Sequence, residues 1–420
     1  MKLKKLRELR VEKMENHLTY QVSIIGGGLA GLTLAIQLAD AGYSCILFEK
    51  NKYPFHKVCG EYISMESWSF IERLGLDLTA LNLPKINRLQ VSSPSGKLLK
   101  HKLDLGGFGI SRYLLDSKLA ELAKQKGVKL LDDCRVNDVK FDPTEKGRTG
   151  GKQFSIDSSQ GVFNSEVCVG AWGKKSNLDN KLRSLSPKTA SDSLLQLEKV
   201  SEGRMRQGGR GRTGKNYVGI KYHVDIDFPA DLIELHNFKN GYCGISKIEE
   251  NRYCLCYLTD SENLKMYNGD IKKMEEEVLF QNPFLKDYFS RAKFLFQEPL
   301  AISQIKIGYK SAVENNILML GDTAGNIAPL SGNGMSMAMR SSFELNKMLN
   351  NYFKNNITRQ ELESQYTHFW TSQFKKRVEL SRVLQKLLKN SNMTNVVIGI
   401  LKVVPFLRNR IVKSTHGKPF

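Results

Sequence analysis

A glycine cluster and a carboxylate are the first residues in this sequence whose spacing indicates chemistry. Gly26, Gly28 and Gly31 form the pattern GxGxxG, and Glu49 follows at the end of the next apolar run. Gly26 permits a tight turn, Gly28 removes a side chain where a pyrophosphate would approach, and Gly31 lets a helix pack closely on a strand. Glu49 can accept hydrogen bonds from both ribose hydroxyls and would repel a 2′-phosphate. These residues indicate a site for FAD or NAD rather than NADP.

A second set of polar and glycine residues occurs far along the chain. The apolar run Ile317–Leu320 ends in Gly321-Asp322, and APLSGNGM (328–335) then leads into a helical pattern. An aspartate at a strand end can hold ribityl hydroxyls, and a helix N-terminus can stabilise negative charge on a flavin. This spacing fits FAD, while an ordinary strand–loop–helix with a capping Asp322 remains the alternative.

The segment KVCGEYIS (Lys57–Ser64) contains a cysteine that needs explanation. Cys59 follows His56 with the spacing HxxC, which suits a metal pair, a covalent flavin link, a redox thiol or a small residue beside a cofactor. Two further ligands at suitable spacing are missing, so we predict no metal site. The seven cysteines are scattered without a CxxC pair, which favours a reduced, cytoplasmic protein.

The elements that must position these residues are visible in the hydrophobic periodicity. A strand at 22–25, a helix at 29–41 and a strand at 45–49 form the βαβ opening of a parallel sheet. Arg112 begins a second helix, at 112–126. Beyond residue 215 the segments alternate as antiparallel strands do, which predicts a separate, β-rich domain.

Five motifs together resemble a known superfamily. They are GGGLAG with Glu49, KVCGE, SRYLLDSKLAELA, GAWGKKS and GDTAGNIAPLSGNGM. In order and type, over roughly residues 20–350, they resemble the FAD-dependent superfamily of aromatic-ring hydroxylases (class A flavin monooxygenases) and geranylgeranyl reductases. The resemblance implies an α/β fold: a Rossmann-type (GR2-like) FAD-binding domain interrupted by a β-sheet substrate domain. We expect the FAD-binding domain at 21–180 and 300–350, the substrate domain at 181–299, a basic N-terminal extension at 1–20 and a basic helical C-terminal segment at 351–420.

The resemblance also implies which residues contact FAD. The ADP half would be bound by Gly26, Gly28, Ala30, Gly31 and Glu49, and by the backbone of Val136. Towards the flavin we expect Lys57, Cys59, Gly60, Arg112, Asp322, Gly332, Gly334 and Met335. Cys59 would first of all form a wall of the flavin site, with a catalytic role as a secondary prediction.

The predicted reaction is hydroxylation of a hydrophobic or phenolic substrate, polyketide-like or isoprenoid-like, by an FAD-dependent monooxygenase. The alternatives are a C=C reductase of the geranylgeranyl reductase type and an electron-transfer flavoprotein. The strand Tyr242–Lys247 lacks the Trp and Pro of the reductase motif, and the WxWxIP motif of halogenases is absent. Ala171-Trp172-Gly173 replaces the family's Asp-Gly, so the electron donor, NAD(P)H or another, stays open.

Three residues are predicted to contact the substrate. Glu234 and His236 alternate on one strand and share a face, which would be that of the substrate pocket or an exposed strand edge. Pro329 lies in the loop before the last predicted helix of the FAD-binding domain.

The net charge of +20 is concentrated near the C-terminus, where residues 375–420 hold eleven lysines or arginines and one acid, Glu379. Apolar residues 396–407 lie between these cations. We therefore expect peripheral contact with an anionic membrane, with a solvated basic helix as the alternative. We expect no transmembrane helix and no nucleic-acid binding, and the oligomeric state stays open.

Overall fold

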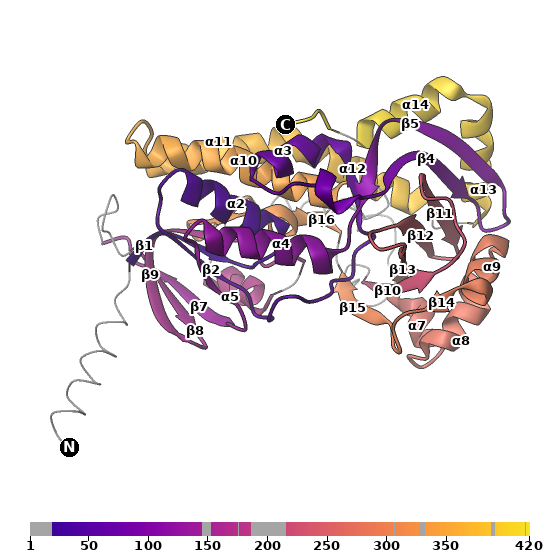
Figure 1. Ribbon diagram of the computed structural model, residues 1–420, viewed down its shortest axis with the longest axis horizontal. Coiled ribbons are helices and arrows are strands. Elements are labelled where there is room, and N and C mark those ends of the chain that lie inside the picture. The colour runs from indigo at the N-terminus through magenta and orange to yellow at the C-terminus, as the bar shows by residue number, and fades with distance from the viewer. Residues whose placement is uncertain are drawn as a thin grey trace, which may run out of the picture.

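The computed structural model describes residues 19–144, 153–174, 176–185, 216–305, 307–326, 332–387, 391–415 and 417–420. Within them two large sheets lie side by side, with long helices over the first and C-terminal helices beside the second (Figure 1). Residues 1–18 of the expected N-terminal extension 1–20, most of the basic stretch 182–214, and Pro329 lie outside the described residues, and β1 begins at Thr19.

The first sheet is the parallel sheet predicted from the βαβ opening. Its strand order is β17-β18-β9-β1-β2-β6, with β7 and β8 joined to β9 as an antiparallel extension. Neighbours from β18 to β6 run parallel, and β17 is antiparallel to β18. The strands are β1 (Thr19–Ile25), β2 (Cys45–Phe48), β6 (Lys129–Leu131), β7 (Val136–Phe141), β8 (Phe154–Ser158), β9 (Gly161–Gly170), β17 (Val313–Glu314) and β18 (Ile317–Met319).

Three helices carry the residues that face the predicted cofactor. They are α2 (Leu29–Asp40), α4 (Arg112–Gln125) and α10 (Gly334–Phe353), and α2 packs against both of the others. Nearly every residue of α2 is buried, as expected for a helix that is apolar on all sides. Thr33 of α2 and Ser342 of α10 are joined by a buried 2.7 Å hydrogen bond between their hydroxyls. Two motifs distant in sequence are thereby held side by side.

The second sheet is mostly antiparallel, with the order β14-β10-β13-β12-β11-β4-β5-β3, and β15 pairs with β10. Its strands are β3 (Tyr62–Ser64), β4 (Lys85–Ser92), β5 (Leu98–Gly109), β10 (Tyr217–Asp225), β11 (Leu232–Phe238), β12 (Gly241–Lys247), β13 (Tyr253–Asp260), β14 (Lys293–Phe294) and β15 (Leu300–Ile305). Three helices form a core with it: α7 (Ser261–Met266), α8 (Ile271–Met274) and α9 (Pro283–Arg291).

The contribution of residues 62–109 to this sheet differs from the expected organisation. They fall within the expected FAD-binding domain, yet β4 pairs in parallel with β11, with Leu89 opposite Ile233 and Val91 opposite Leu235. The physical reason is burial, because these apolar side chains gain a shared apolar environment only when the two strands are neighbours.

The remaining short elements connect or support the sheets. They are α3 (Trp68–Arg73), α5 (Asn177–Leu185), β16 (Gly308–Tyr309), β19 (Gly325–Asn326), the 3₁₀ turns Met65–Ser67, Thr79–Leu81 and Gly321–Thr323, and the π-helical turn Glu275–Leu279.

The C-terminal segment is helical, as predicted. It contains α11 (Arg359–Trp370), a π-helical turn (Thr371–Lys375), α12 (Lys376–Leu387), α13 (Ser391–Val403) and α14 (Pro405–Thr415). Helix α11 packs on α10, and α13 packs on β5. Among the described helices, none has the length and apolar character that crossing a bilayer requires.

Candidate active site

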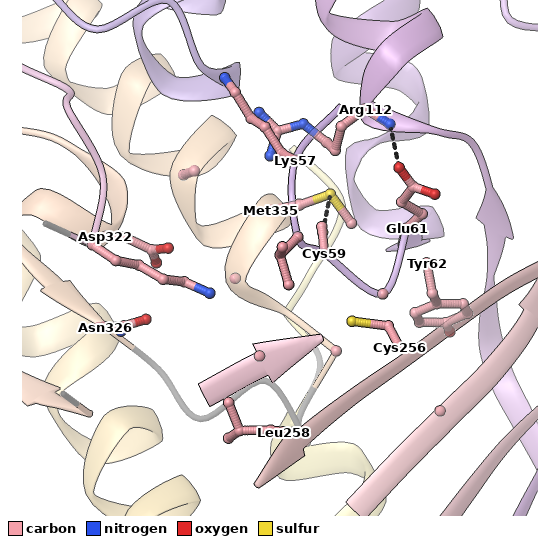
Figure 2. Close-up of a pocket in the computed structure, with 18 of the residues that line it drawn as sticks. Lys57, Cys59, Glu61, Tyr62, Arg112, Cys256, Leu258, Asp322, Asn326 and Met335 are labelled. Carbon is pink, nitrogen blue, oxygen red and sulfur yellow. Dashed lines mark hydrogen bonds between the residues drawn. The ribbon is translucent and has the colours of Figure 1, made fainter. Parts of the chain in front are cut away.

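A cavity of about 800 Å³ lies where the two sheets meet, and residues of both sheets line it. The glycine-rich turn after β1, the segment 55–62 and the start of α10 form one part. The other part is lined by apolar side chains of β4, β5, β11, β15, α13 and α14. Figure 2 shows Cys59 and Met335 together in the view, with Lys57 and Arg112 above them and Asp322 to one side.

The glycine-rich turn has the geometry that a bound pyrophosphate needs. Gly26 has a φ of +116°, and a Cβ there would lie 2.3 Å from the Ala171 carbonyl oxygen. A Cβ on Gly31 would lie 2.1 Å from the carbonyl oxygen of Gly26. Gly28 differs, because the nearest atoms to a Cβ there are Arg112 Nη2 at 3.6 Å and Lys57 Nζ at 3.7 Å. The open side of Gly28 therefore faces two cations.

These two cations share one buried carboxylate. Arg112 donates from Nε to Asp116 Oδ1 and from Nη2 to Oδ2, both at 2.7 Å, and Lys57 Nζ donates to Oδ2 at 3.0 Å. Burial opposes ionisation of Asp116, but Arg112 and Lys57 together lower the pKa of this carboxyl group. Two positive charges against one negative leave a net positive charge beside Gly28, which suits a phosphate. The pair Arg112–Asp116 has helical i,i+4 spacing, a signal present in the sequence that we did not use.

Glu49 lies at the end of β2 on the cavity wall and is fixed by three donors. Its Oε2 accepts from the Gly27 N–H at 2.9 Å, and its Oε1 accepts from the backbone and side-chain N–H groups of Asn51. The carboxylate is thus placed beside the glycine-rich turn, where a ribose would lie. Val136 does not line the cavity, although Cys134, two residues earlier, donates its N–H to the Glu49 carbonyl oxygen at 2.8 Å.

The residues predicted around the flavin are brought together by the fold. Cys59 Sγ lies 3.6 Å from Met335 Sδ, and Gly60, Gly332 and Gly334 line the same cavity. A Cβ on Gly60 would meet no atom within 4 Å, so its open side is free for a ligand. Asp322 also lines the cavity, where burial raises its pKa against the opposing effect of Lys174, Arg112 and Lys310.

Ala30 and Trp172 complete this part of the cavity wall. The Trp172 indole donates to Asp179 Oδ1 at 2.9 Å, and Gly173 donates its N–H to the Thr323 hydroxyl at 2.8 Å. Trp172, in the segment that replaces the family's Asp-Gly, is thus part of the wall next to Asp322. The glycines, the paired cations and the two terminal carboxylates fit the donor and acceptor pattern of FAD, and contacts at individual residues stay predictions.

Glu61, which we did not single out from the sequence, is the centre of a buried ionic cluster. Its Oε1 accepts from Lys221 Nζ at 2.5 Å and from the Arg112 N–H at 2.8 Å, and its Oε2 lies 2.7 Å from His223 Nε2. Burial favours the neutral acid, but hydrogen bonding by His223 and the charge of Lys221 lower the pKa of Glu61. No local signal predicts this cluster, since Lys221 and His223 lie 160 and 162 residues from Glu61 in the sequence.

One group in this cluster has the proximity of a metal site. The ligand atoms of Glu61, His223 and Cys254 lie within 4.8 Å of one another. The Lys221 ammonium already supplies a cation to the same carboxylate, so we assign no metal there.

His56 and Cys59 do not act as a pair in this arrangement. The His56 ring stacks on Tyr113 with centroids 4.5 Å apart and makes edge contacts with His223 and Phe296. Burial, followed by the positive charge of Lys221, lowers the pKa of His56 to about 4. The ring is therefore a neutral aromatic wall at ordinary pH.

Glu234 and His236, predicted to contact the substrate, do not line the cavity. Both side chains are buried, and they share a face of β11 as expected, but that face points away from the cavity. His236 Nε2 lies 2.8 Å from Glu234 Oε2, its Nδ1 lies 2.8 Å from the Ser92 hydroxyl, and its ring stacks on Phe284. The intervening residues Ile233 and Leu235 line the cavity instead. The alternation along the strand predicted that Glu234 and His236 share a face. It could not predict that α9 covers this face of β11.

Two phenols in the cavity wall have no hydrogen-bond partner among the described residues. They are Tyr62, which follows Glu61, and Tyr242 on β12, and both hydroxyl oxygens are buried. Burial raises the pKa of both phenols, so they remain protonated donors. A buried hydroxyl without a partner is costly, which makes each of these phenols a candidate donor to an acceptor that the described residues do not supply.

Comparisons with known proteins agree with an FAD-binding fold. Residues 19–159 match the family model described as FAD binding domain. The chain is 25% identical to conditioned medium factor receptor 1 of Dictyostelium discoideum over 88% of this chain and 71% of that protein. It is 22% identical to the FAD-dependent monooxygenase ntnA of Nectria sp over 79% of this chain and 44% of that protein. It is also 22% identical to the digeranylgeranylglycerophospholipid reductase of Methanococcus vannielii over 90% of each.

A solved structure shares the fold. A geranylgeranyl bacteriochlorophyll reductase-like protein of Thermoplasma acidophilum superposes with a TM-score of 0.70, covering 96% of this chain and 97% of that one at 14% identity. This likeness confirms the predicted fold. The family model and the relatives confirm the resemblance to the hydroxylase and reductase superfamily, the cofactor FAD and the oxidoreductase class.

Proposed function

We propose that this FAD-dependent oxidoreductase hydroxylates an elongated apolar substrate that carries an oxygen function, such as a phenol or carbonyl. The observation that carries the proposal is the apolar part of the cavity, which is continuous with the flavin wall at Cys59 and includes the two unpartnered phenols, Tyr62 and Tyr242. An apolar wall with few, fixed polar groups is typical of sites that bind hydrophobic molecules.

The roles of the protein's own residues follow from this arrangement. Lys57 and Arg112 would bind the phosphates of FAD, and Glu49 would bind a ribose. Bound FAD supplies the redox chemistry. The apolar side chains would orient the substrate and exclude water, and Tyr62 and Tyr242 would donate hydrogen bonds to its oxygen.

Hydroxylation is favoured over double-bond reduction by the weak acidity of the groups beside the apolar wall. Reduction of a C=C bond needs a proton donor at carbon, whereas burial raises the pKa of Tyr62 and Tyr242 and raises that of Cys256 to about 12. Such groups donate hydrogen bonds well but release protons reluctantly.

Reduction remains the second candidate because the match to the archaeal reductase extends over 90% of both chains. The strand nearest to the reductase motif also lines the cavity, through Tyr242, Gly244, Ile245 and Ser246. In that reaction Cys59, whose thiol lies on the flavin wall, would be the candidate to supply the proton to the substrate carbon.

The deciding experiment uses the purified holoprotein with bound flavin, a panel of long-chain phenols and polyprenyl lipids, and NAD(P)H or dithionite as reductant. Oxygen consumption with a product heavier by one oxygen atom supports hydroxylation. Anaerobic turnover with a product heavier by two hydrogens selects reduction. Flavin that cycles without changing any member of the panel selects electron transfer.

A further inference from the structure

The last two helices have apolar side chains on two opposite sides. On one side Val397, Ile398 and Leu401 of α13 and Ile411 and Val412 of α14 line the cavity. On the other side the exposed apolar residues are Val396, Ile400, Val403, Phe406 and Leu407, of which Val403 and Phe406 are 78% and 73% exposed. Figure 1 shows both helices at one end of the molecule, beside β4 and β5.

The outward side of α13 is a continuous stripe. Val396, Ile400 and Val403 have the spacing i, i+4, i+7, so their side chains lie in a row along the helix. Phe406 and Leu407 extend the apolar surface at the start of α14, beyond the break at Val404. A cluster of exposed large apolar side chains on adjacent helices is unusual for a free surface and indicates an occupant.

The charges around this surface identify the kind of occupant. Lys402, Arg410 and Lys413 are exposed on α13 and α14, whereas Arg408 lines the cavity. Residues 391–415 contain no aspartate or glutamate, and the acid beside these cations is Asp104 of β5, 3.9 Å from Lys413 Nζ. A second copy of this chain would bring the same cations face to face in a two-fold contact. An anionic bilayer offers acyl chains to the apolar side chains and negatively charged headgroups to the cations.

We propose that α13 and α14 dock on an anionic lipid bilayer and form the route by which an apolar substrate passes from the membrane into the cavity. The outward side chains would insert among the acyl chains, and Lys402, Arg410 and Lys413 would contact lipid phosphates. The inward side chains of the same helices already form the cavity wall, so a substrate leaving the bilayer would remain in apolar surroundings. This proposal rests on the proposed function for its substrate, but not for the membrane contact itself.

The membrane contact is tested by co-flotation of the FAD-loaded protein with vesicles of phosphatidylcholine and phosphatidylglycerol at 7:3. The native protein should float with these vesicles, and a smaller fraction should float with pure phosphatidylcholine. High salt should remove the additional flotation that the anionic lipid causes. The double variant Val403→Ser/Phe406→Ser should bind about tenfold more weakly or worse. The matched control Val162→Ser/Met266→Ser changes two exposed apolar side chains elsewhere and should bind as the native protein does.

A second measurement does not depend on the folding of that double variant. The fluorescence of a Phe406→Trp variant, after subtraction of the native signal, should shift to shorter wavelength when the anionic vesicles are added. Absence of that shift, or flotation of Val403→Ser/Phe406→Ser equal to native, overturns the proposal. The proposal is also overturned if the native protein is a dimer in solution and does not bind vesicles, while the double variant is a monomer.

Failure of the membrane proposal and failure of the proposed function are distinguishable. Turnover of a detergent-dispersed substrate should be unchanged in Val403→Ser/Phe406→Ser, whereas turnover of the same substrate in vesicles should fall about tenfold with vesicle binding. If Val403→Ser/Phe406→Ser and the native protein turn over the substrate in vesicles at equal rates, the delivery route is contradicted, even if the native protein binds the vesicles. If the protein binds vesicles but turns over no substrate, the membrane contact is supported and the proposed hydroxylase function is contradicted.

Discussion

Lys221 and Glu61 form an ion pair whose two side chains are wholly buried, with Nζ and Oε1 2.5 Å apart. The pair joins β10 of the second sheet to the segment that carries Cys59, because Lys221 Nζ also donates to the Lys57 carbonyl oxygen at 3.2 Å. It therefore fixes the flavin wall relative to the apolar part of the cavity. An ion pair therefore helps to hold this wall in place, in addition to apolar packing.

Glu61→Gln should destabilise the protein by about 3–5 kcal/mol, because it leaves the Lys221 ammonium buried without its counter-charge. Denaturant unfolding measures this loss. The control Glu121→Gln removes an exposed pair with Lys118 and should change stability by less than about 1 kcal/mol. The double variant Glu61→Gln/Lys221→Met should lose less than the two single variants combined. A loss in Glu61→Gln no larger than in the control contradicts the buried pair.

His56→Phe should make the folded protein less sensitive to mild acid. The pKa of His56 is lowered to about 4 in the folded state, below its usual 6.5. The neutral ring therefore contributes stability that is present above pH 6.5 and is lost as the pH falls towards 4. Since the ring is only partly buried, we expect a difference of about 1 kcal/mol between native and variant protein over this range. Unfolding curves at pH 7 and 4.5 measure it, with His368→Phe on the surface of α11 as control; parallel pH profiles contradict the prediction.

Two alanine substitutions in one turn should have different effects. Gly28→Ala meets no atom closer than 3.6 Å, so the apoprotein should fold normally, but the methyl group would occupy the phosphate position. Gly31→Ala places its Cβ 2.1 Å from the Gly26 carbonyl oxygen and should destabilise the fold by about 1–3 kcal/mol. We expect FAD affinity to fall at least about tenfold in Gly28→Ala, measured by flavin fluorescence titration. Native affinity in this variant would place the pyrophosphate elsewhere.

Cys59→Ser should retain FAD and most of the turnover. The thiol contacts Met335 Sδ, and the Cys59 carbonyl oxygen accepts from Cys254 Sγ at 3.2 Å, a contact that the serine preserves. Flavin absorbance and steady-state rates check this. Complete loss of turnover with flavin retained would assign chemistry to the thiol.

Tyr62→Phe and Tyr242→Phe should leave stability unchanged or raise it by up to about 1 kcal/mol, because each removes a buried hydroxyl without a partner. If these hydroxyls bind the substrate's oxygen, the KM of a phenolic substrate should rise about tenfold while FAD binding stays native. The contrast is Tyr366→Phe, which removes a 2.7 Å hydrogen bond to the Met319 carbonyl oxygen and should cost about 1–2 kcal/mol without affecting KM. Unchanged KM in both tyrosine variants contradicts their role.

The parts of the site that could be predicted are those specified by local sequence. The turn at Gly26–Gly31, the strand ending at Glu49 and the helix that begins at Gly334 each have a periodic pattern and a chemical reason in adjacent residues. The side to which Glu234 and His236 point is set by α9, whose residues Phe284 and Tyr288 cover that face. Glu61 is likewise neutralised by strand residues from a distant part of the chain. Such contacts follow from the topology, which local patterns do not contain.

The parallel pairing of β4 with β11 has a consequence for the order of folding. During synthesis the β4–β5 hairpin emerges more than a hundred residues before Leu232–Phe238, so one of its edges waits without a partner. A nascent chain that ends before β11 contains the glycine-rich turn, Glu49 and the apolar side chains of β4 and β5, but it lacks Asp322, α10 and the rest of the cavity wall. Both parts of the cavity therefore stay incomplete until the later strands and helices are synthesised, and in the meantime the unpaired edge is where a chaperone or a neighbouring chain would first attach.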